Sequence, residues 1–149
     1  MSSDVFLDAS YVIALAATSD ELHAPAIELA KRMQAEQRRL VTTHAVLCEI
    51  ANSLAKERYR AAAVRLLRSL QKDPNIEVVR ISDELFAEGF ELYSQRTDKD
   101  WGLTDCISFV VMRQHGIAES LTADDHFRQA GFIALLRDRD VQGKATGGR

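Results

Sequence analysis

The sequence predicts an α/β fold with a mostly parallel sheet and helices on both faces of that sheet. Short apolar runs typical of buried strands alternate along the chain with longer segments in which apolar residues recur at helical spacing. This alternation is typical of strand–helix–strand units, in which consecutive strands lie parallel. The 149 residues are 46% hydrophobic, which fits one compact domain with one core.

Three strands and four helices are predicted in the first half of the chain. Pro74 and Asn75 end the fourth helix ahead of the apolar run IEVVRI. The predicted strands are residues 5–7, 40–42 and 76–81, and the predicted helices are residues 10–16, 21–37, 44–57 and 60–72.

The second half continues the alternation. Ser82 is a predicted N-cap for a helix that lasts to Gln95. The polar loop RTDKDWG separates this helix from another that starts in LTDCIS and ends at Gly116. Short strands are expected at residues 120–122 and 132–136, the second of them at an edge of the sheet. We expect one domain over residues 1–140 and a flexible, glycine-rich tail over residues 141–149.

The composition is that of an ordinary soluble globular protein. Charged residues make up 28% of the chain and the net charge is -3, a balance that indicates no class of partner. The N-terminal residues MSSDVFLDAS lack the basic residues of a signal peptide, and no apolar run reaches the roughly 18 residues of a spanning helix. We therefore expect a cytoplasmic protein without a membrane partner.

The two cysteines, Cys48 and Cys106, both stand among apolar neighbours in predicted helices. Both are predicted to be buried free thiols. Because neither a C-x-x-C motif nor a zinc-type Cys/His spacing occurs, the sequence does not predict a zinc site.

Three acids are predicted to lie at one edge of the sheet. Asp8 follows the first strand and Asp124 follows the strand at 120–122. The carboxyl ends of parallel strands share one edge, and ligands of such sheets bind there. Asp105 stands in the first turn of the LTDCIS helix and faces the same crevice if that helix begins at this edge.

A fourth acid, Glu49, lies in the helix HAVLCEIANSLAKE. It falls about 120° from the centre of the apolar stripe, so it flanks the buried face and can reach inward over the edge of the sheet. Taken singly, each acid has an ordinary explanation: Asp8 and Asp124 as helix N-caps, Asp105 in the field of a helix dipole, and Glu49 as a solvated residue.

The four acids together require a different explanation if they converge. Carboxylates a few ångströms apart repel by up to about 4 kcal/mol per pair at an effective dielectric constant near 20. A cluster of this kind needs a counterion, and all-oxygen ligation selects a hard divalent cation such as Mg²⁺ or Mn²⁺. Metal-assisted hydrolysis of a phosphodiester is the chemistry that follows.

At these positions the sequence resembles the PIN-domain ribonucleases and, within them, the short VapC-like toxins of bacterial toxin–antitoxin pairs. The resemblance covers about residues 4–136 and rests on the motifs DAS, LTDCIS and T-x-D-x-x-F, the last formed by Thr122, Asp124 and Phe127. Because Asp125 follows Asp124, the fourth acid could also be assigned one residue later; the spacing to Phe127 favours Asp124.

The resemblance implies a Mg²⁺-dependent endoribonuclease, with Mn²⁺ as a substitute ion. Its members are usually homodimers, cut RNA and are inhibited by a cognate antitoxin. By this resemblance, Asp8 and Asp105 are direct metal ligands, and Glu49 and Asp124 complete the acidic pocket. Ser10 and Thr104 match hydroxyl positions that hold the ligands in place.

One region of the sequence is strongly basic. Between Lys56 and Lys72 there are six basic residues and a single acid, Glu57. Contact with RNA, contact with an antitoxin and a solvated helix face all explain this pattern. The candidate contact residues are Arg58, Arg60, Arg65 and Arg68.

Other classes of protein compete with the nuclease as explanations of the sequence. One is a non-catalytic PIN-like module that binds RNA or protein and uses the acids as caps. A receiver or phosphatase with a nucleophilic aspartate ranks lower, because Ser10 stands where the phosphatase pattern needs a second acid. No histidine is predicted to act in proton transfer, and His126 is expected to lie on a turn beyond Asp124.

Overall fold

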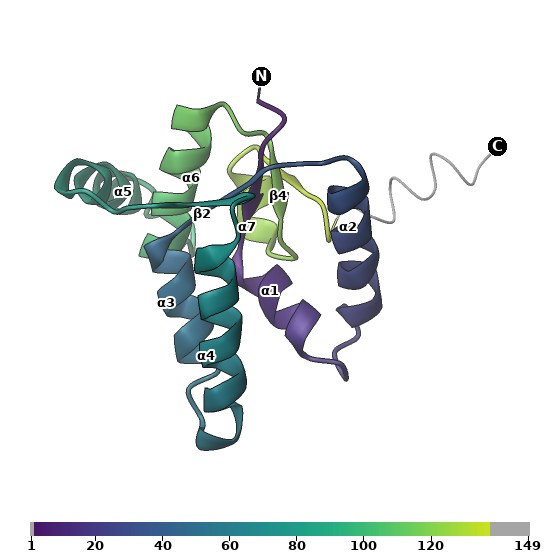
Figure 1. Cartoon of the computed structure of the whole chain (residues 1–149). Coiled ribbons are helices and arrows are strands. Elements are labelled where there is room, and N and C mark those ends of the chain that lie inside the picture. The colour runs from purple at the N-terminus through teal and green to yellow at the C-terminus, as the bar shows by residue number, and fades with distance from the viewer. Residues whose placement is uncertain (1, 138–149) are drawn as a thin grey trace.

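The computed structural model describes residues 2–137, and its centre is a five-stranded sheet (Figure 1). All strand pairs are parallel, and the strand order is β3-β2-β1-β4-β5. The strands are β1 Val5–Leu7, β2 Leu40–Thr43, β3 Ile76–Val79, β4 Glu119–Leu121 and β5 Ile133–Ala134. The predicted α/β class with a parallel sheet is confirmed.

Seven helices flank the sheet among the described residues. They are α1 Ala9–Ala16, α2 His23–Ala35, α3 His44–Ser53, α4 Glu57–Lys72, α5 Asp83–Gln95, α6 Leu103–His115 and α7 Asp125–Gln129. Helix α1 packs against α2, and α5 packs against α6. Right-handed crossovers place α1–α4 on one face and α5–α7 on the other, because the chain runs outward from β1 to β3 and then returns to β4. The molecule is therefore a three-layer α/β/α sandwich.

The centre of the sheet is the driest part of the molecule. Val5 and Phe6 of β1 are fully buried, and Leu7 is nearly so. Such short, continuous apolar strands are what a sheet covered on both faces requires. Phe6 contacts Phe127 of α7, and Phe109 of α6 packs edge-on against the same ring, so the aromatic core links β1 to the two helices that carry candidate site residues.

Close packing of α5 on α6 depends on one glycine. A Cβ at Gly89 would lie 2.5 Å from Cγ1 of Ile107, so the helices approach at a distance that a side chain would prevent. Ile107 is two residues beyond Asp105, and this contact therefore helps to fix the first turn of α6.

The predicted elements agree with the structure in order and type, and the differences are local. The helix predicted over residues 44–57 ends at Ser53, and α4 begins at Glu57. Arg60 Nη2 donates to the Ala55 carbonyl at 2.7 Å, which stabilises the turn between the two helices. The last strand is an edge strand, as predicted, but is only Ile133–Ala134. The predicted tail, residues 141–149, lies outside the described residues.

The prediction for the cysteines is half wrong. Cys106 is buried in α6, whereas Cys48 is exposed. Helix α3 buries Val46, Leu47 and Ile50, and Cys48 falls on its outer side. In the part of the chain that the structure describes, no helix combines the length and apolar character needed to span a bilayer.

Candidate active site

The candidate site lies where β1 and β4 end. These neighbouring strands are parallel, with Leu7 opposite Leu121, so the residues that follow them emerge side by side. The strand order reverses between β1 and β4, since β1 leads to β2 on one side and β4 leads to β5 on the other. In open parallel sheets, a reversal of this kind opens the crevice in which ligands bind.

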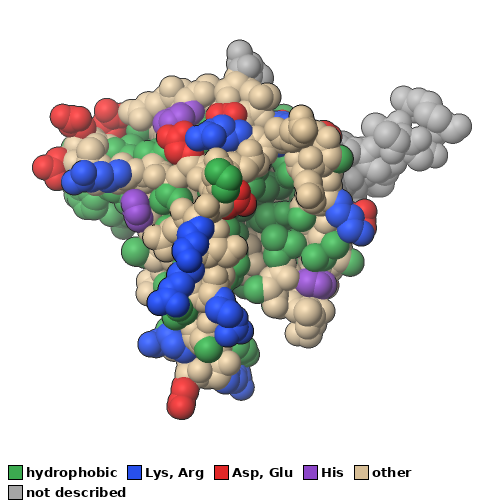
Figure 2. Space-filling view, viewed as in Figure 1, with side chains coloured by type: hydrophobic (Ala, Val, Ile, Leu, Met, Phe, Trp, Pro, Cys, Tyr) green, Lys and Arg blue, Asp and Glu red, His purple; other side chains and the backbone are tan. Residues whose placement is uncertain are grey.

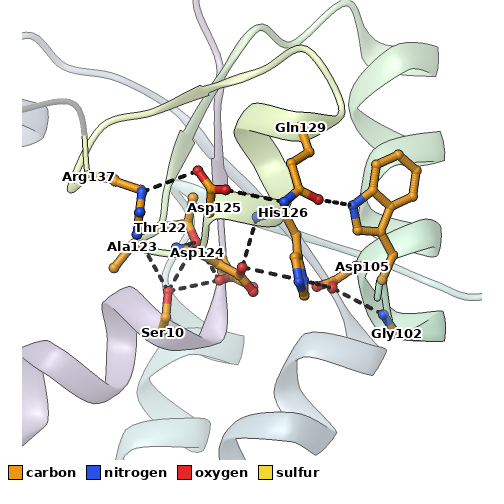
Figure 3. A network of polar contacts seen from close by, with 12 residues as sticks. Ser10, Gly102, Asp105, Thr122, Ala123, Asp124, Asp125, His126, Gln129 and Arg137 are labelled. Atoms are coloured by element: carbon orange, nitrogen blue, oxygen red, sulfur yellow. Dashed lines mark hydrogen bonds and ion pairs between the residues drawn. The ribbon is translucent and has the colours of Figure 1, made fainter. Parts of the chain in front are cut away.

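Asp8 is the most buried acid of the site. It is 5% exposed, and two hydroxyls hold its carboxylate. Thr122 Oγ1 donates to Asp8 Oδ2 at 2.7 Å, and Ser10 Oγ donates to the same oxygen at 2.9 Å. The two hydroxyl oxygens lie 3.0 Å apart, and the Ala123 N–H donates to Ser10 Oγ at 3.1 Å (Figure 3). This network fixes the orientation of the Asp8 carboxylate.

A second group joins α6 to α7. His126 Nδ1 lies 2.9 Å from Asp105 Oδ2 and 3.4 Å from Asp124 Oδ1. Figure 3 shows the imidazole ring directed at both carboxylates. Backbone N–H groups orient the acids, since Gly102 donates to Asp105 Oδ2 at 3.2 Å and His126 donates to Asp124 Oδ1 at 2.9 Å. The sequence predicts His126 close to Asp124 on the following turn, without a role in proton transfer; in the structure the first turn of α7 also brings its ring to Asp105.

The two groups meet through Thr122. Its Oγ1 donates to Asp8 and accepts from the Asp124 N–H at 3.0 Å, so one side chain joins the ends of β1 and β4 to the start of α7. Thr122 is fully buried. Sequence reasoning placed Thr122 in the T-x-D-x-x-F pattern but gave the hydroxyl role to Thr104. The signal that identifies Thr122 is its position one residue beyond the strand that pairs with β1.

Thr104 is partly exposed in the first turn of α6, and its carbonyl accepts from Ser108 Oγ at 2.8 Å. This contact belongs to the helix backbone. The role of the Thr104 hydroxyl toward the acids stays a prediction.

The positions of Asp124 and Asp125 separate the two assignments of the fourth acid. Asp124 lies with His126 in the crevice. Asp125 instead forms an ion pair with Arg137 at 3.3 Å (Figure 3) and another with Arg128 at 3.5 Å. The geometry therefore favours Asp124.

Capping explains some of these acids but not all. Asp124 caps α7, and Asp105 accepts from the N–H of Gly102, the N-cap of α6. Asp8 occupies the N-cap position of α1, yet hydroxyls from the residue after β4 and from α1 hold its carboxylate. A cap needs neither the burial of Asp8 nor the approach of Asp105 to Asp124.

Glu49 lies in α3, the helix that directly follows β2. The residue as a whole is solvent-exposed. Partial desolvation of its carboxyl, together with the negative charges of Asp8, Asp105 and Asp124, raises its pKa to about 7. Glu49 is therefore close enough for its charge to interact with those of all three aspartates.

The other ionisable groups are perturbed as a cluster. Burial raises the pKa of Asp8, although the hydroxyls of Thr122 and Ser10 oppose this shift. Burial and the charge of Asp124 raise the pKa of Asp105 against the hydrogen bond from His126. The pKa of His126 is raised: desolvation acts in the opposite direction but is outweighed by the hydrogen bond to Asp105 and the nearby carboxylates. In the absence of a cation, the crevice thus favours bound protons.

The donor set fits a divalent cation. Ligand atoms of Asp105, Asp124 and His126 all lie within 4.8 Å of one another, and Asp8 and Glu49 are coupled to them by charge. Carboxylate oxygens suit Mg²⁺ and Mn²⁺ as ligands. The raised pKa values of Asp8, Glu49 and Asp105 indicate that neighbouring positive groups do not neutralise these carboxylates.

The fold and the site define an α/β protein with a carboxylate-rich crevice of the metal-binding type. Comparison with protein families gives a match to the PIN domain over residues 5–133, so the chain belongs to the PIN-domain family.

Similar proteins of known activity come from Mycobacterium tuberculosis. The chain is 28% identical over 132 residues to the 23S rRNA-specific endonuclease VapC20 of strains CDC 1551 / Oshkosh and H37Rv, covering 88% of this chain and 97% of the relative. The crystal structure of VapC20, described as a Sarcin-Ricin loop cleaving toxin, superposes with a TM-score of 0.77 at 26% identity. It covers 87% of this chain and 97% of that one.

The raised acid pKa values predict how stability depends on pH. Glu49 has a pKa of about 7 in the folded protein against an ordinary value of 4.5, so the folded state binds more protons than the unfolded state between these values. The free energy of unfolding of the metal-free protein should therefore fall as pH rises through this window. Urea unfolding in chelator at pH 5, 6, 7 and 8 measures the slope.

Glu49→Gln should make that slope shallower, because glutamine is neutral throughout. Glu28→Gln, which changes an exposed acid of α2, is the matched control and should leave the slope unchanged. Equal slopes in the parent and Glu49→Gln would contradict the assignment of Glu49 to the acidic crevice.

Proposed function

We propose that the protein is a metal-dependent endoribonuclease that hydrolyses RNA phosphodiester bonds and acts as the toxin of a toxin–antitoxin pair. The observation that supports this proposal is the approach of Asp8, Asp105 and Asp124 to one another at the ends of β1 and β4 and the start of α6, with Glu49 of α3 close enough to interact with their charges. Family membership and the similarity to a 23S rRNA-specific endonuclease support the same activity.

Asp8 and Asp105 are the proposed direct ligands of Mg²⁺, with Mn²⁺ as a substitute, while Glu49 and Asp124 complete the pocket, partly through water. A bound divalent cation supplies a nucleophile by lowering the pKa of water and neutralises charge on the scissile phosphate. Ser10 and Thr122 fix the orientation of the Asp8 carboxylate. A ligand of Mg²⁺ needs a fixed orientation, because this small ion demands near-ideal octahedral geometry.

The substrate proposed first is 23S rRNA, because the similar proteins are named for it. We also propose that the protein acts in the cytoplasm, where such RNA is found. The alternative function is a non-catalytic PIN-like module that binds RNA or protein. It predicts that the acids can be replaced without loss of function, which the nuclease does not.

Asp8→Asn and Asp105→Asn should each lower RNA cleavage by at least about 100-fold, since each removes a charge that stabilises the reacting phosphate through the cation. Both variants should also make the metal-free protein more stable, because they relieve repulsion. Cleavage of total RNA in Mg²⁺ or chelator and urea unfolding measure the two effects.

Asp125→Asn is the matched control, because Asp125 pairs with Arg137 and Arg128 outside the crevice. It should retain parental cleavage. Cleavage at the parental rate by Asp8→Asn would refute the role of Asp8, whereas no cleavage of RNA by the parent protein in Mg²⁺ would favour the non-catalytic module.

Helix α4 is the proposed RNA contact. Figure 2 shows lysine and arginine side chains along its outer face, and Figure 1 shows α4 beside α3, the helix that carries Glu49. The candidate residues are all exposed: Arg58, Arg60, Arg65 and Arg68. Exposed arginines along one helix can neutralise RNA phosphates, and the counterions released in this way increase the affinity. The same residues are also available to an antitoxin, which we propose as the inhibitory partner.

Removal of two of these charges should weaken RNA binding and its salt dependence. The measurement uses Asp8→Asn protein, which should leave the RNA intact. Adding Arg65→Ala and Arg68→Ala to it should reduce the slope of log affinity against log salt by about 0.7 for each arginine that contacts a phosphate. Fluorescence anisotropy across a salt series gives the slope. Lys31→Ala, an exposed change on α2, is the control; identical slopes in all three proteins would exclude α4 as the contact.

A homodimer is proposed from the surface of α5. Leu85 and Gly89 are the buried residues of this helix. On its outer side Phe86, Phe90 and Tyr93 are 48%, 51% and 47% exposed and form consecutive ring contacts at 6.5 and 6.2 Å. A contiguous exposed aromatic stripe is typical of a protein interface, and a second copy would cover it.

Phe90→Glu should weaken the dimer by about 2 kcal/mol or more, because it places a charge at the centre of the stripe. Sedimentation velocity over a range of concentrations measures the shift toward monomer. Tyr59→Glu, at an exposed aromatic of α4, serves as the control and should leave the association unchanged. A dimer of unaltered strength in Phe90→Glu would place the interface elsewhere.

A further inference from the structure

His126 belongs to the crevice but has no role among the four acids that the sequence pattern supplies. Its ring approaches both neighbouring carboxylates through Nδ1, at 2.9 Å from Asp105 Oδ2 and 3.4 Å from Asp124 Oδ1. The ring is partly exposed, so solvent and ions have access to it. Its backbone is fixed as well, because its N–H donates to Asp124 Oδ1 at 2.9 Å.

These separations match those of neighbouring ligands on one metal ion. In octahedral coordination with ligand bonds of about 2.1 Å, adjacent ligand atoms lie about 3 Å apart. The Nδ1 atom meets this spacing to Asp105 and comes close to it for Asp124, and all three ligand atoms lie within 4.8 Å of one another. A cation can therefore be bound with only small movements of these side chains.

We propose that His126 is a metal ligand through Nδ1, together with Asp105 and Asp124, and that it makes the site bind Mn²⁺ in preference to Mg²⁺. This inference rests on the proposed function, which requires a divalent cation in the same crevice. It adds a nitrogen ligand to a site that the four acids alone would make all-oxygen.

The preference follows from ligand chemistry. Imidazole suits transition metals, whereas Mg²⁺ selects carboxylate, carbonyl and water oxygens. Nitrogen ligation therefore strengthens binding of Mn²⁺ more than binding of Mg²⁺. The ligand is the neutral ring with its proton on Nε2, so the cation takes the place of the proton that joins Nδ1 to Asp105 in its absence. Because occupancy also depends on the abundance of each ion, Mg²⁺ can still serve as cofactor.

Pulsed electron paramagnetic resonance of bound Mn²⁺ tests the ligation directly, without RNA. The parent protein loaded with Mn²⁺ should show modulation from a directly bound ¹⁴N nucleus, and His126→Ala should lose it. In parallel titrations, His126→Ala should weaken Mn²⁺ binding by about 10–100-fold and Mg²⁺ binding by much less. His126→Asn, which places a carboxamide near the Nδ1 position, should keep the site but lose both the nitrogen modulation and the Mn²⁺ preference.

His115→Ala is the matched control, because His115 Nδ1 contacts the Val111 carbonyl on α6 at 3.0 Å, and it should retain the nitrogen signal. Absence of nitrogen modulation in the parent, its persistence in His126→Ala, or equal loss of both ions would overturn the inference. The last result would identify His126 as a positioning residue for Asp105. Failure of the inference about His126 would leave RNA cleavage dependent on Asp8 and Asp105. Failure of the proposed function would appear instead as no cleavage by the parent protein in Mg²⁺, or as cleavage that does not require Asp8, with the nitrogen signal of the parent protein unchanged.

Discussion

Repulsion among carboxylates in a partly buried crevice is the constraint on which the rest of the site depends. Asp8 is almost completely buried, and the charges of its neighbours reach it as well as Glu49 and Asp105. A fold gains nothing from such an arrangement in the absence of a cation, because each added charge raises the cost of the next. The arrangement therefore fits the proposed site for a divalent cation.

The architecture provides this crevice through strand order. Placing β4 beside β1 brings Thr122 next to Asp8, and the reversal of strand order opens the sheet edge at that position. Thr122 then links the Asp8 carboxylate to the Asp124 backbone, so two acids from the ends of two strands belong to one hydrogen-bonded network. The aromatic contacts of Phe109 and Phe127 hold α6 and α7 to the core and so set the positions of Asp105 and His126.

The sequence was sufficient to predict the fold and the approach of Asp8 and Asp124 at one edge of the sheet, because both depend on local patterns. Strand runs such as VFL and the acids that follow them are visible without tertiary information, and parallel topology then places Asp8 and Asp124 together. His126 and Thr122 could not be assigned in this way. Their roles depend on where a side chain points within one helical turn and on which strand lies next to which. Cys48 was misjudged for a similar reason, since its apolar neighbours in sequence lie on the other side of α3.

The most direct test of the central claim is thermal or urea unfolding of the metal-free protein at pH 8 as Mg²⁺ is added. At 100 times its dissociation constant, a cation that binds the folded crevice should raise the free energy of unfolding by about 2.7 kcal/mol, and Asp8→Asn should largely remove this gain. No stabilisation by Mg²⁺ or Mn²⁺, or an equal gain in the parent and Asp8→Asn, would show that the acids do not form a metal site.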